Sequence, residues 1–141
     1  MPSGACCFSE GLRMGAEIYH QLKKLLDEQG LSTGIGDEGG FAPDLKDAEE
    51  VFQYLDRASR AAGYEPGKDL VFAMDAAASE LYDKEKDAYA FPGESRMKGA
   101  CIFRSSGELV EYYRQLIGKY PLACIEDGLA ETAWGGWKPL T

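Results

Sequence analysis

Two acidic residues directly follow short apolar runs, at positions from which carboxylates could bind a metal ion. Asp75 follows the run at residues 70–74, and Glu126 follows the run at residues 122–125. Such runs are typical of strands buried on both faces of a parallel sheet, and reactive groups of α/β folds gather at the carboxyl ends of those strands. Neighbouring strands would bring both carboxylates to one rim, where they could share magnesium, a cation that prefers oxygen ligands. The alternative is that each acid merely ends its strand and faces solvent.

A third acidic residue, Glu38, lies in a glycine-rich stretch with the sequence GDEGGFAP at residues 36–43. Flanking glycines allow positive φ angles and a close approach of the backbone to a ligand. A carboxyl group on such a loop could act as a general acid if its pKa were raised. A solvated acidic turn is the simpler alternative, and the pattern leaves both open.

Two other motifs point away from nucleotides and zinc. Residues 34–39 satisfy G-x-G-x-x-G, but they follow a predicted helix instead of a strand, and their two acids would repel a pyrophosphate. The four cysteines include the adjacent pair Cys6 and Cys7 but no C-x-x-C pair, and the chain has one histidine. This spacing does not predict a zinc site, and it suits a reducing compartment better than a disulfide framework.

Two helices are predicted ahead of the first strand. Apolar residues recur at helical spacing over residues 9–29, with Ser9 as the expected N-cap and Gly30 as the stop signal. A second helix is expected to begin near Asp47, whose spacing to Glu50 matches a capping box. Two consecutive helices with no strand between them already constrain the topology.

The second half of the chain alternates between strands and helices. The strands at residues 70–74 and 122–125 are separated by a polar hairpin at 81–91 and by a helix that begins near Ser105, with a capping-box glutamate three positions later. A further helix is expected to begin at Trp134. This alternation predicts an α/β fold in which the two strands run parallel with a right-handed crossover.

Charge and composition restrict the partners. The 141 residues are 45% hydrophobic and 28% charged, as in ordinary globular domains, and the net charge is −9. This charge argues against nucleic acid or an anionic membrane surface as the main partner. No signal peptide and no apolar run of about 20 residues is visible, so we expect a cytoplasmic protein.

Three motifs together resemble the enolase family. The loop GDEGGFAP at 36–43 resembles the family's loop motif, AMDAAASE at 73–80 resembles its first magnesium-ligand strand, and the segment 120–131 resembles its second in the bacterial form. The opening segment 3–17 also fits, although Cys6 and Cys7 replace a more polar pair. The resemblance covers essentially the whole chain in the family's order.

This resemblance implies the fold and the chemistry. Residues 1–141 would be part of the C-terminal domain of the enzyme, a partial TIM-like α/β barrel of the enolase type. The reaction would be that of phosphopyruvate hydratase, the reversible dehydration of 2-phosphoglycerate to phosphoenolpyruvate with Mg²⁺. Asp75 and Glu126 would ligate magnesium, and Glu38 would belong to the acid that assists departure of the hydroxyl group. The partner would be this small substrate, and the parent enzyme would be a homo-oligomer.

The resemblance also implies that parts of the family's machinery are missing from this chain. The N-terminal capping domain and first barrel strand would precede residue 1, and later strands, a third metal ligand and the catalytic lysine would follow residue 141. We therefore expect a barrel truncated at both ends and inactive alone. Alternatives are a non-catalytic partial-barrel interaction module and, less well matched by the glycine-rich loop, a related acid-sugar dehydratase.

Overall fold

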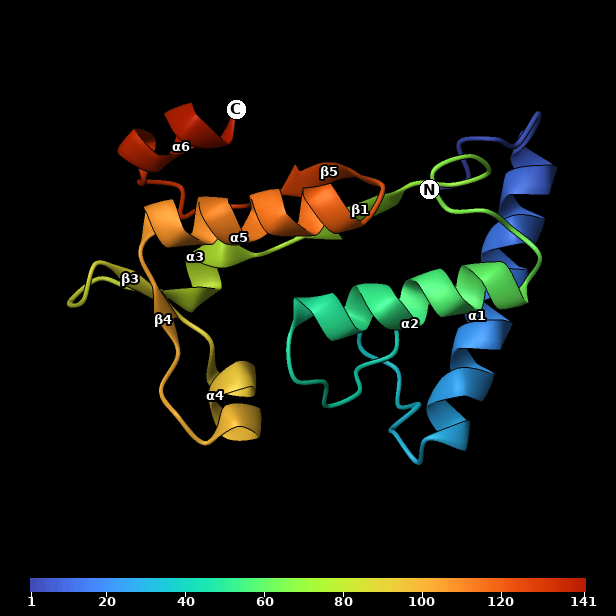
Figure 1. Cartoon of the computed structure of the whole chain (residues 1–141), viewed down its shortest axis with the longest axis horizontal. Helices are drawn as coiled ribbons and strands as arrows, with labels where there is room; N and C mark the ends of the chain where they lie inside the picture. The colour runs from blue at the N-terminus through green and yellow to red at the C-terminus, as the bar shows by residue number, and fades with distance from the viewer. The chain divides into compact units, whose positions relative to one another are not determined.

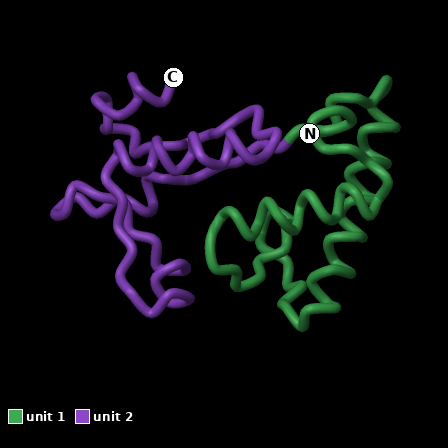
Figure 2. The backbone as a smooth tube through the Cα atoms, in the orientation of Figure 1, with its two compact units in different colours: residues 1–71 green, residues 72–141 purple.

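The computed structural model of the protein describes all residues, 1–141. It divides into two compact units, residues 1–71 and 72–141 (Figure 2). The first unit is helical, and the second combines helices with all the named strands (Figure 1).

Two helices form the first unit. Helix α1 spans Phe8–Glu28 and packs on α2, which spans Ala48–Ala61. The predicted stop is confirmed, because α1 ends just before Gly30, which has a φ of 67°. The predicted N-cap is wrong: Cys7 occupies that position in extended backbone, and Ser9 lies inside the first turn.

Helix α2 begins as its sequence predicts. The Asp47 side chain accepts a hydrogen bond from the Glu50 N–H at 3.1 Å, which satisfies one of the otherwise unpaired N–H groups of the first turn. The reciprocal bond of a capping box is displaced by one residue, because Glu50 accepts from the N–H of Lys46. The apolar faces of the two helices form a small core with these buried residues: Met14, Leu26, Phe52, Tyr54 and Ala58.

A parallel pair of strands organises the second unit. Strand β1 spans Phe72–Asp75 and pairs in parallel with β5, which spans Leu122–Glu126. Helix α5, Ser106–Lys119, lies between them in sequence and packs on β5. The parallel arrangement is confirmed, and so is the start of α5, where Ser105 forms a complete capping box. Strand β1 is shorter than predicted and includes Asp75 itself.

A second, antiparallel sheet was predicted only in part. The expected hairpin is present as β2, Tyr82–Asp83, and β3, Ala88–Ala90. A third strand, β4 at Phe103–Arg104, pairs with β3, and no sequence pattern predicts it. Three short helices complete the unit: α3, Ala78–Leu81; α4, Pro92–Lys98; and α6, Trp134–Leu140. The last one confirms the helix predicted from Trp134.

The core of the second unit lies between α5, the hairpin and the segment after β5. Its most completely buried large side chains are Tyr89, Leu109, Leu116 and Leu129. The Tyr89 hydroxyl accepts a hydrogen bond from the N–H of Ala130 at 3.0 Å, which ties the hairpin to the segment after β5. The alternating helices and strands form no closed barrel, consistent with the predicted partial barrel.

Candidate metal centre

Asp75 and Glu126 are partners in the register of the parallel pair. Each is the last residue of its strand, β1 or β5. Adjacent strands lie about 4.8 Å apart, and residues in register project toward the same face of a sheet. Both side chains are exposed. The two carboxylates that the sequence places at strand ends therefore meet at one rim.

Backbone hydrogen bonds continue the pairing beyond the strands. The N–H of Ala76 donates to the Glu126 carbonyl at 2.9 Å, and the N–H of Ala78 donates to the Asp127 carbonyl at 2.9 Å. The two chain segments that leave the strands are thus held together directly beyond the acids. This bonding fixes the positions of Asp75 and Glu126 relative to each other along the strand direction.

Both segments turn sharply directly after the acids. Ala77 has a φ of 42° and Asp127 a φ of 46°, in the left-handed region that costs a residue with a Cβ roughly 1–2 kcal/mol. Within the turn, Asp75 Oδ1 accepts a hydrogen bond from the Ala77 N–H at 3.0 Å. This bond orients the Asp75 carboxylate and leaves Oδ2 available for another ligand.

The donor set fits a hard divalent cation. Asp75 and Glu126 supply oxygen ligands on one face, and neither forms an ion pair with a lysine or arginine of the chain. Two negative charges side by side repel each other, and a cation between them would remove that repulsion. Magnesium typically takes one or two protein carboxylates and fills its remaining positions with water and substrate oxygens.

Glu38 lies in a tight turn of the first unit. Residues Ile35 and Phe41 form an antiparallel bridge around it, and Gly36 and Gly40 are joined by a backbone hydrogen bond of 2.9 Å. Gly39 has a φ of 81°, which explains the need for glycine there. The Glu38 side chain is exposed and projects from a constrained loop.

The same turn is anchored on helix α1. The ring of Tyr19 stacks on Phe41 with centroids 4.4 Å apart, and the Tyr19 hydroxyl donates to the carbonyl of Gly39 at 3.5 Å. The G-x-G-x-x-G match ends in this turn and opens no helix, as expected from its context, because α2 begins only at Ala48. Glu38 belongs to the first unit, and the two strand-end acids belong to the second.

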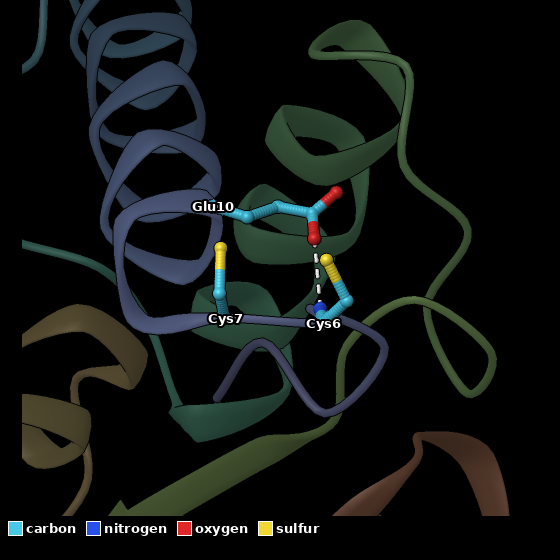
Figure 3. A group of neighbouring side chains, drawn as sticks. All are labelled: Cys6, Cys7 and Glu10. Carbon is cyan, nitrogen blue, oxygen red and sulfur yellow. Dashed lines mark hydrogen bonds between the residues drawn. The ribbon is translucent and has the colours of Figure 1, made fainter.

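The cysteine spacing in the sequence did not predict a separate cluster of potential metal ligands at the start of α1. The side chains of Cys6, Cys7 and Glu10 lie close together there (Figure 3). A hydrogen bond with the Glu10 carboxylate raises the pKa of the Cys6 thiol. The hydrogen bond with Ser9 lowers the pKa of the Cys7 thiol, and the backbone N–H of Glu10 acts in the same direction. Two adjacent thiols thus differ in acidity.

None of the helices combines the length and apolar character needed to cross a membrane. A comparison with protein-family models gives a match over the full length of the chain. Residues 1–141 match the family described as enolase, C-terminal TIM barrel domain.

Proposed function

Because the chain belongs to the enolase C-terminal TIM barrel domain family, we propose that it supplies part of the active site of a bacterial-type enolase. The reaction would be the magnesium-dependent, reversible dehydration of 2-phosphoglycerate to phosphoenolpyruvate, in the cytoplasm. The observation that carries this proposal is the in-register pairing of Asp75 and Glu126 at the ends of two parallel strands. Carboxyl ends of parallel strands are where α/β barrels place their reactive groups.

Asp75 and Glu126 are the proposed magnesium ligands. The bound metal would stabilise the negative charge that develops on the substrate when a proton is removed beside its carboxylate. The protein's contribution is to hold both carboxylates at a fixed separation before the metal arrives. The hydrogen bond from Ala77 to Asp75 and the ladder bond from Ala76 to Glu126 provide that order.

Glu38 is proposed to belong to the acid that protonates the departing hydroxyl group. A general acid needs a proton to donate and a defined position near the leaving group. The stacking of Tyr19 on Phe41 and the bridge around the turn give the loop a defined conformation. Substitution of Glu38 by glutamine keeps the shape of the side chain and removes the proton to be donated.

The reaction also needs a base, which neither site strand supplies. Strands β1 and β5 contain no lysine, and the residues that follow them are Ala76 and Asp127. Groups that act as a unit lose most of their rate when one of them is missing. We therefore expect the 141-residue chain alone to show no 2-phosphoglycerate dehydration above that of a Glu38→Gln variant. Measurable activity that this substitution abolishes would contradict the expectation.

Metal binding tests the ligand assignment without requiring activity. Mn²⁺, a paramagnetic substitute for Mg²⁺, can be titrated into the purified chain and followed by electron paramagnetic resonance, with Mg²⁺ as competitor. Asp75→Asn and Glu126→Gln should each weaken binding by more than about tenfold. Glu80→Gln, a neutralised exposed acid on the nearby α3, is the matched control and should bind like the unmodified chain. Equal affinity in all four proteins would refute the assignment.

One observation favours a second candidate, a non-catalytic interaction module. The β1–β5 sheet has only two strands, so each strand has one edge without a partner strand. Unpaired strand edges are templates for pairing with another chain. Size-exclusion chromatography and thermal melting separate the two candidates: a monomer with a cooperative melt would favour an evolved module, and aggregation would favour a piece of a larger barrel.

A further inference from the structure

Three potential metal ligands converge at the start of α1, and none of them is among the acids assigned above. One ligand atom from each of Cys6, Cys7 and Glu10 lies within 4.8 Å of the other two (Figure 3). A tetrahedral zinc site, with metal–sulfur bonds of about 2.3 Å and metal–oxygen bonds of about 2.1 Å, requires ligand separations of about 3.6–3.8 Å. Side-chain rotations can close the remaining gap, because both cysteines are exposed.

The local backbone explains why these three residues meet. Cys7 is the N-cap of α1 and is extended, with φ −154° and ψ 165°, so the chain changes direction there. The first turn of the helix then brings Glu10 back over the cysteines. Glu10 Oε2 accepts a hydrogen bond from the backbone N–H of Cys6 at 2.7 Å, which holds the carboxylate against the pair (Figure 3).

Hydrogen bonds to the ligands resemble the outer contacts that orient metal ligands in proteins. The Cys6 N–H holds the Glu10 carboxylate beside the cysteines (Figure 3), and a carboxylate oxygen that accepts one hydrogen bond has a further lone pair for a metal. Cys7 Sγ lies 3.3 Å from the Ser9 hydroxyl, which can donate a hydrogen bond to a thiolate. The N-terminal end of a helix also favours negatively charged groups, which suits the Cys7 thiolate and the Glu10 carboxylate.

Disulfide formation between the two cysteines is geometrically disfavoured. Adjacent Cα atoms are about 3.8 Å apart across a trans peptide, and the chain has no cis peptide bonds. Disulfides normally need Cα atoms about 4.4–6.8 Å apart. Both thiols are free in the structure. The pair is therefore better suited to share an external ligand than to close on itself.

We propose that Cys6, Cys7 and Glu10 form a binding site for a thiophilic divalent cation of the zinc class, with water as the fourth ligand. Thiolate ligands select zinc-like metals, and the all-oxygen pair Asp75 and Glu126 suits a hard cation such as magnesium. The site is independent of the proposed enolase chemistry. The ligand spacing C-C-x-x-E differs from the C-x-x-C spacing that is typical of zinc sites, so the sequence alone does not predict this site.

Cadmium is the probe of choice, because cadmium–thiolate bonds absorb in the ultraviolet and report ligand identity directly. The reduced, metal-free chain is titrated with Cd²⁺, and Zn²⁺ is then added as competitor. We expect saturation at one Cd²⁺ per chain, with displacement by Zn²⁺. Saturation at one ion per two chains would overturn the proposal, because the ion would then be shared between molecules.

Variants assign the ligands. Cys6→Ser and Cys7→Ser should each remove about half of the thiolate absorption and weaken binding, and Glu10→Gln should weaken binding by more than about tenfold while still accepting the Cys6 N–H bond. Cys101→Ser removes an exposed cysteine of the other unit and should change nothing. Unchanged binding in Glu10→Gln would overturn the three-ligand site, and so would a loss in Cys101→Ser equal to that in Cys7→Ser.

Discussion

The ion pair between Glu94 and Arg104 gives a sharp stability prediction. The two guanidinium nitrogens of Arg104 donate to the two carboxylate oxygens of Glu94 at 3.1 and 2.8 Å, and the side chains are only 15% and 7% exposed. The guanidinium also stacks over Phe91 and Tyr112 at 4.2 and 4.4 Å from the ring centroids. Because these contacts remain after substitution of Glu94, a cation would be left nearly buried without its counter-charge.

The magnitude follows from burial. Removing one partner of a buried ion pair costs about 3–5 kcal/mol. Glu94→Gln keeps one oxygen as an acceptor for Arg104, and the slight exposure of Arg104 allows some hydration, so we expect a loss of about 2–3 kcal/mol. The variant also loses a contact with the more exposed Lys98 at 3.2 Å, which adds little.

Tryptophan fluorescence isolates the unit concerned. The only two tryptophans, Trp134 and Trp137, both lie in the second unit, so urea unfolding followed by their emission reports that unit. A loss of 2–3 kcal/mol should appear as a lower urea midpoint at an unchanged slope. Linear extrapolation to zero urea gives the free energy of unfolding of the second unit.

A matched control removes the same charge from the surface. Glu111 pairs with Arg114 at 2.8 Å, but the side chains are 52% and 69% exposed. Glu111→Gln should therefore cost less than about 1 kcal/mol. If Glu94→Gln and Glu111→Gln destabilise the second unit equally, the burial of the first pair does not have the energetic role assigned to it here.

Three further outcomes are expected. Tyr89→Phe leaves the buried N–H of Ala130 without its 3.0 Å acceptor and should lower the free energy of unfolding by about 1–3 kcal/mol, measured by the same fluorescence titration; a neutral effect would contradict the assigned bond. Ala77→Gly relieves the positive φ and should raise that free energy by up to about 1 kcal/mol; destabilisation would show that the turn is not strained. The thiolate is the nucleophile in alkylation, and the pKa of Cys7 is lowered whereas that of Cys6 is raised, so Cys7 should react with iodoacetamide at lower pH than Cys6. Peptide mass spectrometry across a pH series measures the labelling of each cysteine. Equal pH midpoints for the labelling of the two cysteines would refute this prediction.

The elements that position the acids could be predicted because their signals are local. An apolar run followed by an acid identified β1 and β5, and the spacing from Ser105 to Glu108 identified the start of α5. The register that places Asp75 opposite Glu126 could not be predicted, because it depends on pairing across a long connection with a shift after Phe72. The sequence predicts both acids at one rim, and only the structure shows that they are direct partners in register.

Other features depend on contacts that no local pattern contains. Strand β4 and helix α4 are short, and the Ser95 hydroxyl holds them together by accepting a hydrogen bond from the Ile102 N–H at 2.9 Å. Serine is a good cap, which favours Ser9 as the N-cap of α1, but the helix begins two residues earlier, with Cys7 as N-cap and a hydrogen bond from the Cys6 N–H to Glu10. The same bond holds Glu10 beside the two cysteines, a contact that no local sequence pattern contains.

The long connection between the paired strands also sets an order of events during folding. Asp75 and Glu126 are about 50 positions apart, and Tyr82 and Tyr89 of the hairpin are fewer than ten apart. Because closing a long loop costs more entropy than closing a short one, the hairpin and α5 can form first, and the parallel pairing follows. On a ribosome, the two acids cannot become partners before residue 126 has emerged. The rim that would hold the metal is thus among the last features of its unit to form.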